Sequence, residues 1–421
     1  MKKIRIFLII IIFFLIVNVF LVNPTGKAHA LSNEKVGQIS SGFSHTLTIK
    51  GGKVYSWGLN TYGQLGNGTN INSNIPVQVS NLTNVIFVAA GGNSSAALKE
   101  DGTIWSWGTN SYGKLGDGTT TNSNVPVQVV GLTNVKAIAV AQMHSMAVKK
   151  DGTVWTWGRN NVGQLGDGTT TNRLVPVQLI GLTGVTEISV LNFSTLVLKQ
   201  DKTVWTWGGK AQGQLKDSTL VPIRVTGLTD VRSVSSGGNY GIAIKEDGTV
   251  WSWGDNFYGQ LGDGTKIARP VPAQINGLTN VNVVTAGLYR AYAVKIDGSV
   301  WSWGQNANGQ LGDGTKIDRA VPTLATNLSN VSIVVAAQSF SAAILKNNRI
   351  ISWGYTRDGV LGDGIIYEDL YTLIPKYVNF TTKIKYFYHS NNRIDYILIG
   401  DIKYLYIYDA NGNLTSVQKV V

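Results

Sequence analysis

Few residues of this 421-residue chain have the types and spacing that catalysis or metal binding requires. The histidines His45, His144 and His389 lie far apart in the sequence, and no two of them have the spacing of a metal site. There is no Gly-x-Ser-x-Gly motif, no phosphate-binding loop and no cysteine, which excludes disulfides and thiolate metal ligands. We therefore predict no catalytic residues, no metal ligands and no cofactor, and we keep an enzyme site assembled from distant segments as an alternative.

Five carboxylates lie in Gly-Asp-Gly corners that could suggest calcium binding: Asp117, Asp167, Asp263, Asp313 and Asp363. Each corner supplies one acid, whereas a calcium ion needs about six to eight oxygen ligands, with several acids close together. An aspartate in such a corner can instead accept hydrogen bonds from the backbone of its own turn. The corners therefore predict capped turns rather than metal sites.

The candidate binding residues lie in a short turn that recurs along the chain and is called the variable turn below. Its copies differ strongly, for example Gly92-Asn93-Ser94 against Leu288-Tyr289-Arg290. The side chains predicted to bind a partner are Phe43, Met143, Phe193, Tyr240, Tyr289, Arg290 and Phe340. Exposed aromatic residues with an arginine are typical anchors of protein interfaces, because they bury much area at a small cost in entropy.

A repeated tryptophan-glycine step defines the elements that must position these turns. The step returns at Trp57, Trp107, Trp157, Trp207, Trp253, Trp303 and Trp353, with intervals of 50, 50, 50, 46, 50 and 50 residues. A fixed period of this length indicates one supersecondary unit copied in tandem. Hydrophobic residues make up 43% of the chain, which is enough for a packed core.

The third repeat shows four expected strands, over residues 135–141, 144–149, 153–157 and 175–179. The variable turn joins the first strand to the second, and an Asp-Gly corner joins the second to the third. A proline recurs in the fourth strand of all seven repeats, which predicts a strand at a sheet edge. Seven units of about four short antiparallel strands predict an all-β fold, a single β-propeller with seven blades.

The motifs Trp107-Gly108-Thr109-Asn110, 113–119 and Pro126-Val127, with their equivalents, resemble the regulator of chromosome condensation repeat family over residues 36–380. The resemblance implies a propeller, usually seven-bladed, with the variable turns as a ring at one mouth. It also implies a structural hydrogen-bonding role for a histidine at the start of the second strand. In the alternative reading, the ring side chains plug the central channel or pack under its rim. Repeats four and seven depart from the loop pattern at 213–219 and 359–365, so we expect different loops in those two blades.

Residues 384–409 contain three further expected strands without tryptophan, which leaves eight blades as an alternative to seven. We predict a seven-repeat propeller over 31–383, with 384–421 as a degenerate partial repeat that closes or caps it.

The first thirty residues have a basic start, an apolar run from Ile6 to Val22 and the small-residue site Ala28-His29-Ala30. This pattern predicts a signal peptide over 1–30, cleaved after Ala30, with an uncleaved membrane anchor as the alternative. The formal net charge is +12, but no continuous basic stripe interleaved with aromatics is present, so nucleic-acid binding is not predicted. The positive charge would attract the protein to an anionic cell wall or membrane surface.

These observations favour a monomeric, secreted or cell-surface bacterial protein without enzymatic activity. We predict a binding module that recognises an extracellular protein or a cell-wall polymer through one propeller mouth, with membrane contact only if the signal is retained. Guanine-nucleotide exchange, the best-known family activity, needs a GTPase that an exported protein would not meet. A similar secreted propeller, a β-lactamase inhibitor protein, binds its target through a mouth, so inhibition of an extracellular enzyme is one alternative. A hydrolase or lyase with its site at the mouth is the other.

Overall fold

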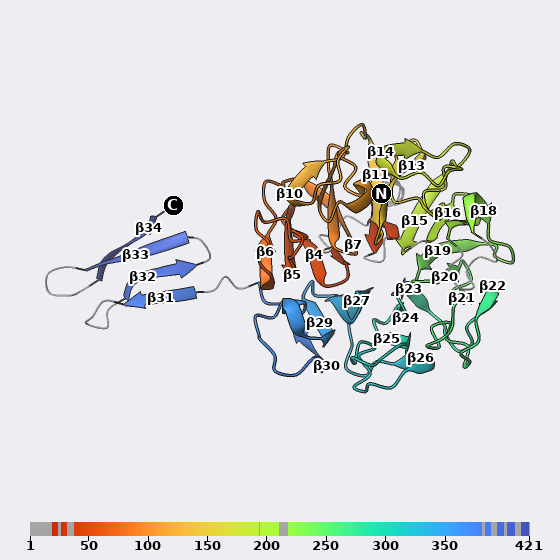
Figure 1. Ribbon diagram of the computed structural model, residues 1–421. Helices are drawn as coiled ribbons and strands as arrows, with labels where there is room; N and C mark the ends of the chain where they lie inside the picture. The colour runs from red at the N-terminus through yellow and green to blue at the C-terminus, as the bar shows by residue number, and fades with distance from the viewer. Residues whose placement is uncertain are drawn as a thin grey trace, which may run out of the picture. The chain divides into compact units, whose positions relative to one another are not determined.

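The computed structural model describes residues 19–23, 27–31, 38–192, 194–209, 218–380, 384–388, 394–399, 402–408 and 414–420. These residues form mainly strands, with two short 3-10 helices, η1 (Ser111–Gly113) and η2 (Arg357–Gly359). Seven four-stranded antiparallel sheets surround a central axis as the blades of a propeller (Figure 1). The predicted all-β, seven-bladed propeller is therefore confirmed.

Each blade takes its four strands from one continuous stretch of chain, with the first strand nearest the axis (Figure 1). Blades 1 to 4 contain, in order, β3 (Ile39–Ser41), β4 (His45–Lys50), β5 (Lys53–Gly58) and β6 (Ser73–Gln78); β7 (Val85–Gly91), β8 (Ser94–Lys99), β9 (Ile104–Gly108) and β10 (Ser123–Gln128); β11 (Val135–Val140), β12 (His144–Lys149), β13 (Val154–Gly158) and β14 (Arg173–Gln178); β15 (Val185–Leu191), β16 (Ser194–Lys199), β17 (Val204–Gly208) and β18 (Thr219–Arg224). Blades 5 to 7 contain β19 (Val231–Ser236), β20 (Tyr240–Lys245), β21 (Val250–Gly254) and β22 (Arg269–Gln274); β23 (Val281–Ala286), β24 (Arg290–Lys295), β25 (Val300–Gly304) and β26 (Arg319–Leu324); β27 (Val331–Ala336), β28 (Phe340–Leu345), β29 (Ile350–Tyr355) and β30 (Tyr371–Tyr377).

The recurring prolines lie where a missing backbone N–H costs least. Each proline-bearing fourth strand is the edge strand of its sheet, as predicted. In blade 3, Pro176 also falls in the stretch of β14 where the register with β13 shifts, between the pairs Thr156↔Val177 and Gly158↔Arg173. The proline therefore disturbs little of the ladder.

The tryptophan of each tryptophan-glycine step fastens one blade to the blade before it. These seven indoles are buried between sheets. In six of them Nε1 donates to a backbone carbonyl in the preceding blade, at 2.8–3.1 Å, as Trp107 does to Gln64 O. For Trp253 the equivalent acceptor would belong to Gln214, which lies outside the described residues. An indole supplies both a large apolar surface and one donor, and both are used here.

The ring closes by the same contacts that join its other blades. Trp57 Nε1 of blade 1 donates to Val360 O of blade 7 at 3.1 Å, and Gly364 N donates to Asn74 O at 2.8 Å. No strand is exchanged between the two blades among the described residues. The eight-bladed alternative is therefore wrong.

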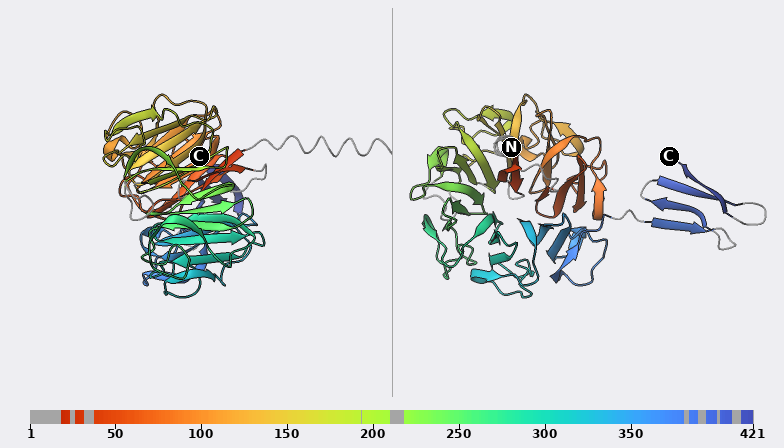
Figure 2. Two further views of the ribbon diagram at one scale, coloured as in Figure 1. Left: turned by 90° about the vertical axis from the view of Figure 1, so that its right-hand side faces the viewer. Right: turned by 180° about the vertical axis from the view of Figure 1, so that it is seen from behind.

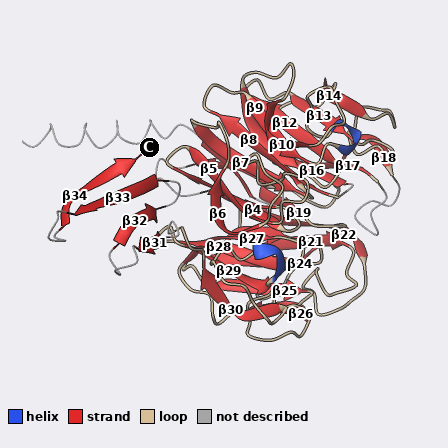
Figure 3. Ribbon diagram, turned by 60° about the vertical axis from the view of Figure 1, so that its left-hand side comes forward, coloured by secondary structure: helices blue, strands red, loops and turns tan. Residues whose placement is uncertain are grey.

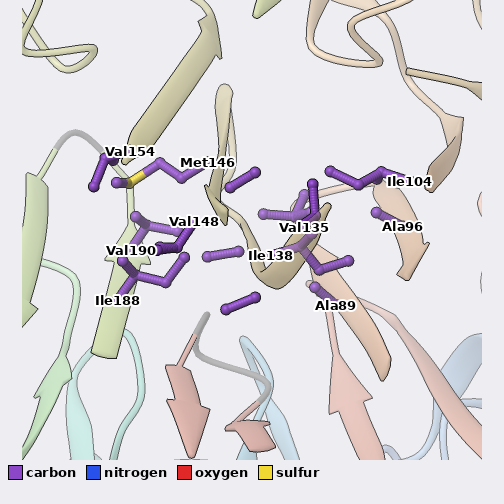
Figure 4. Close-up of a cluster of buried hydrophobic side chains, with 14 of the residues drawn as sticks. Ala89, Ala96, Ile104, Val135, Ile138, Met146, Val148, Val154, Ile188 and Val190 are labelled. Carbon is purple, nitrogen blue, oxygen red and sulfur yellow. The ribbon is translucent and has the colours of Figure 1, made fainter. Parts of the chain in front are cut away.

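The hydrophobic core is distributed between blades rather than collected at one centre. Figure 4 shows one such cluster, in which Met146, Val148 and Val154 of blade 3 face Ile188 and Val190 of blade 4. Inner strands are also linked by side-chain bonds. One of them runs from Ala90 N to Ser40 Oγ at 2.8 Å. Apolar burial and these hydrogen bonds together hold each blade against its neighbours around the axis.

The loop between the third and fourth strands, called the outer loop below, differs in blades 2 and 7 because one glutamine is missing. In blade 1 the Oε1 of Gln64 accepts the backbone N–H of Tyr62 at 2.9 Å, and blades 3, 5 and 6 repeat this bond. Lys114 and Val360 stand at the same place in blades 2 and 7. There the residue two positions earlier adopts a positive φ, 66° at Tyr112 and 60° at Asp358, and the loop forms η1 or η2 (Figure 3).

The expectation of a different loop in blade 7 is thus confirmed, and blade 2 differs as well, which was not expected. The outer loop of blade 4 falls mostly at residues 210–217, outside the described residues.

Near the N-terminus, β1 (Val19–Asn23) pairs with β2 (Lys27–Leu31) as an antiparallel hairpin. The hairpin lies against the inner strands β7, β11 and β15 (Figure 2, in red). The predicted cleavage point after Ala30 falls within β2, whereas residues 1–18 lie outside the described part. Among the described residues, no helix is long and apolar enough to cross a membrane.

Residues Asn379–Val421 form a second compact unit. Its sheet contains β31 (Ile384–Tyr388), β32 (Ile394–Ile399), β33 (Ile402–Tyr408) and β34 (Leu414–Val420). The sequence indicated only three strands here, because the fourth lacks the proline that marks fourth strands elsewhere. The seven blades are complete without this sheet. The fold therefore does not need residues 384–421 to close the ring, as we predicted they would.

Candidate binding face

The tryptophan-glycine step sets the position of each variable turn. In blade 3 the first residue of the second strand pairs with the glycine of the step, His144↔Gly158. Gly158 has φ 106°, and a Cβ atom there would lie 2.7 Å from Met143 O. That carbonyl accepts the backbone N–H of Arg159 at 3.0 Å. Glycine is needed because the turn packs directly on the backbone of the third strand.

The outer loops emerge beside the variable turns. In blade 2 the fourth strand begins opposite the same glycine, at the pair Ser123↔Gly108, so both connections lie at one end of the blade. We call this end of the propeller, with its variable turns and outer loops, the mouth face. The opposite end carries the Asp-Gly corners between the second and third strands.

The first residue of the second strand points between blades, which corrects three of the predicted binding residues. Tyr240 and Arg290 are 0% exposed and Phe340 is 1% exposed. Tyr240 donates from its hydroxyl to Arg290 O, and the Arg290 guanidinium donates to Ala337 O at 2.8 Å and Phe340 O at 2.6 Å. The side chains of Tyr240 and Arg290 thus link neighbouring blades, whereas Phe340 packs against Val360 and Leu361 of its own blade. Because all three are buried, none can act as a surface anchor.

Two histidines occupy the same position and confirm the structural role that the resemblance implied. Nε2 of His45 lies 2.9 Å from Ser95 Oγ, and Ser95 donates its own proton to Gln64 O at 2.8 Å. The imidazole is therefore the donor in this contact. His144 makes the equivalent contact, with Nε2 3.4 Å from Thr195 Oγ1. The third candidate histidine, His389, lies outside the described residues.

Met143 and Tyr289, which directly precede this position, and Phe43, two residues before His45, lie at the mouth face, as predicted. Phe43, Met143 and Tyr289 are half-buried, so part of each side chain meets solvent. Phe193 lies outside the described residues. The predicted ring thus contains buried side chains at the start of the second strand and half-buried side chains at the mouth.

The channel is narrow at this mouth. Phe43, Leu191, Leu288 and Gln338 from four blades line a cavity with Ala90 and neighbouring backbone. It leaves about 20 Å³ for water-sized molecules, which is room for roughly one water. This cavity therefore has no room for a side chain of a partner.

An aromatic cluster on blades 5 and 6 was missed from the sequence. The rings of Phe257 and Tyr258, in the outer loop of blade 5, meet edge to face with centroids 4.9 Å apart. Tyr258 also lies 5.1 Å from Tyr289 in the variable turn of blade 6. Phe257 is 68% exposed and nearby Ile267 is 74% exposed. Comparing the outer loops between repeats would have found it, because the place of Phe257 is otherwise taken by Thr, Ser, Asn, Ala or Arg.

The Gly-Asp-Gly carboxylates cap their own turns, as predicted. Asp263 accepts from Thr265 N at 2.9 Å, from Asn256 Nδ2 at 3.2 Å and from Arg269 at 2.9 Å. Burial raises the pKa of Asp263, but the hydrogen bonds from Thr265 and Asn256 and the charge of Arg269 outweigh it and hold the pKa below its ordinary value. Within the described ranges, no three His, Asp or Glu side chains gather as metal ligands.

A buried cation lies beneath the mouth face between blades 2 and 3. Lys114 is 3% exposed, and its Nζ donates to Gly91 O at 2.7 Å and to Gln142 O at 3.0 Å. Burial lowers the pKa of Lys114 from 10.5 to about 7. Burial, and secondarily the charge of Lys114, lowers the pKa of His45 and of His144 to about 3. These groups are therefore sensitive to pH although they face no solvent.

Comparisons with known proteins agree with this architecture. A model described as the RCC1-like domain matches residues 19–219, and models of the Regulator of chromosome condensation (RCC1) repeat match 247–288 and 297–344, and 231–260 and 281–310. The Ultraviolet-B receptor UVR8 of Arabidopsis thaliana is 40% identical over 77 residues, which is 18% of each chain. The chain thus matches less than a fifth of that relative's length.

Two solved structures are similar over most of the propeller. Prp20p of Saccharomyces cerevisiae, described with its binding properties to Gsp1p and histones, is 25% identical with a TM-score of 0.65, covering 73% of this chain and 81% of its own. Human WBSCR16 is 25% identical with a TM-score of 0.64, covering 74% and 86%. An RCC1-like propeller of this kind indicates a binding or regulatory module. From its repeats, its blades and these matches, the chain belongs to the regulator of chromosome condensation repeat family.

Proposed function

We propose that this protein is an exported, non-enzymatic binding module that recognises an extracellular protein or a cell-envelope polymer through its mouth face. The observation that carries the proposal is the contrast within the variable turns. Their backbone is held by the same hydrogen bond in six described blades, at 2.7–3.1 Å, while the half-buried residue that supplies the accepting carbonyl changes, for example from Ser44 to Met143 to Tyr289. A fixed frame with changing exposed side chains suits recognition.

The relatives support binding as the general role. Prp20p has binding properties to Gsp1p and histones, so a propeller of this family can present surfaces to other proteins. A non-enzymatic role also accords with the mouth face, where the Gly-Asp-Gly carboxylates are bonded within their own loops.

Export rests on the basic, apolar and small-residue pattern of residues 1–30. Intact-mass spectrometry of the protein from its native host tests it. The expected mature chain begins at Leu31, which removes β1 and most of β2 and leaves the seven blades whole. A mature mass that retains residues 1–30 would contradict cleavage, and recovery of that form in the membrane fraction would favour the anchor.

The binding face can be tested with two variants in one blade. Tyr289 and Ile296 flank β24 at opposite ends, and Ile296 is 67% exposed at the corner between the second and third strands. The wild type, Tyr289→Ser and Ile296→Ser would each be incubated with the host's secreted proteins and with its purified cell wall. Loss of a bound component with Tyr289→Ser alone is the expected result. Equal retention by all three proteins would refute recognition at this part of the mouth face.

A further inference from the structure

We infer that the anchor of the mouth face is the aromatic cluster of blades 5 and 6, and that its partner is a protein surface with an apolar side chain flanked by carboxylates. The cluster consists of Phe257, Tyr258 and Tyr289, with Ile267 and Lys266 beside it. This inference rests on the proposed binding function and gives it a place and a partner chemistry.

The cluster is preorganised and exposed at once. Tyr258 contacts both of the other rings, at 4.9 Å and 5.1 Å between centroids, so the outer loop of blade 5 is tied to the variable turn of blade 6. Asn256 donates to Ile267 O at 3.1 Å, which fixes the backbone of the exposed Ile267 in the same loop as Phe257. Large apolar side chains held in this way lose little entropy on binding, which is the property of interface hot spots.

The Asn256 amide and the Asp255 carboxylate beside the cluster are hydrogen-bonded inside the loop, which argues against a sugar ligand. The Asn256 amide donates to Asp263 and to the Thr265 and Ile267 carbonyls, and its oxygen accepts Leu261 N at 2.9 Å. Asp255 accepts from Phe257 N at 3.2 Å and from Gln260 Nε2 at 3.1 Å. Sugar recognition needs free polar groups for the ring hydroxyls, and the apolar Ile267 contributes none. The surroundings fit an apolar protein side chain.

The charges near the cluster favour an acidic rim on the partner. Asp263 is paired with Arg269 at 2.9 Å and Asp255 is 7% exposed, so neither presents a free carboxylate. Lys266 is exposed and makes no ion pair within the part of the chain that the structure describes. In the neighbouring blade, Lys316 donates to Tyr371 Oη at 2.7 Å. The uncompensated charge beside the cluster is therefore positive, and carboxylates on the partner would complement it.

A random 12-residue peptide library displayed on phage provides the probe. Selection uses the wild type, with prior depletion on the empty support, and the selected peptides are then tested on the double variant Phe257→Ser/Tyr289→Ser. We expect enriched peptides to carry a large apolar residue flanked by Asp or Glu, and synthetic copies to bind the double variant at least about 30-fold more weakly than the wild type. Lys266→Glu should weaken the same peptides about tenfold and reduce their dependence on salt. Thermal unfolding of each variant verifies the fold.

The control variant Phe43→Ser/Met143→Ser separates this inference from the proposed function. If it abolishes peptide binding while Phe257→Ser/Tyr289→Ser does not, the mouth face binds but the cluster is not its anchor. If neither double variant changes binding, both proposals fail. Peptides flanked by Lys or Arg, binding of chitin hexasaccharide lost in the cluster variant, or self-association of the wild type lost in that variant would each overturn the partner chemistry.

Discussion

Lys114 offers the sharpest test of the packing between blades, because a buried amine with no carboxylate partner among the described residues makes stability depend on pH. The substitution is Lys114→Met, which keeps the length of the side chain and removes its charge. The matched control is Lys150→Met, at an exposed corner of blade 3. In the folded protein, burial lowers the pKa of Lys114 from 10.5 to about 7, whereas the unfolded chain keeps the ordinary value.

The sign and the size of the effect follow from that difference. Between pH 7 and pH 10.5 the unfolded state binds more protons at Lys114 than the folded state, so the free energy of unfolding rises with pH. At about 1.4 kcal/mol per pH unit, the wild type should gain about 3 kcal/mol between pH 6.5 and 9.5 relative to Lys114→Met. The hydrogen bonds from Nζ to Gly91 O and Gln142 O favour the charged form and make this an upper value.

Urea unfolding followed by tryptophan fluorescence at a series of pH values measures the gain. All the tryptophans lie in the blades, so the signal reports on the propeller. Lys150→Met should follow the wild type throughout. If Lys114→Met has the same pH dependence as the wild type, Lys114 is not buried as a strained cation and the account of the junction between blades 2 and 3 is wrong.

Two further changes test the blade junctions. Gly262→Ala places a Cβ 2.9 Å from Trp303 Nε1, whereas the control Gly264→Ala, at a similar positive φ, meets nothing closer than 3.7 Å. The first substitution should therefore lower the free energy of unfolding in urea by about 1–3 kcal/mol more than the second. Equal losses would contradict the tight indole contact. Burial lowers the pKa of His45 to about 3, so the unfolded state binds more protons below pH 6.5 and the wild type should lose about 2 kcal/mol between pH 6.5 and 4.5 relative to His45→Gln. An unchanged acid dependence in His45→Gln would show that the imidazole is accessible to protons.

The blade framework was predictable because its signals are local. The expected strand 144–149 coincides with β12, and the expected strand 135–141 extends one residue beyond β11. Alternating side chains, the Asp-Gly corner and the proline of the fourth strand are each read from a few neighbouring residues. The special loop of blade 2 was not predictable in this way. In this loop Lys114 replaces the glutamine whose side chain accepts one backbone N–H in blades 1, 3, 5 and 6. The burial of Lys114 and its bonds to Gly91 and Gln142 depend on residues far apart in the sequence.

The binding residues were predicted less well because the variable turn was treated as a single unit. Tyr289 and Arg290 are adjacent in sequence, yet Tyr289 lies on the rim and Arg290 inserts into the next blade. Successive residues at the start of a strand point in opposite directions, so a difference of one position decides whether a side chain meets solvent or a neighbouring sheet. Phe257 was missed for another reason: it lies in the outer loop, and its neighbour Tyr258 meets Tyr289 through space rather than along the chain.

The same glycine contact that defines the fold also separates structural from recognition positions. The carbonyl just before the second strand packs against the glycine of the tryptophan step and accepts the N–H of the residue after that glycine, which fixes the turn whatever side chain it carries. Changing Tyr289 therefore removes no framework hydrogen bond of its backbone, whereas changing Arg290 removes bonds to Ala337 and Phe340 in the next blade. A propeller built in this way can vary the rim residue of each turn at little cost in stability. Variation at the following residue must be compensated by the next blade, as the different contacts of His45, Tyr240 and Arg290 illustrate.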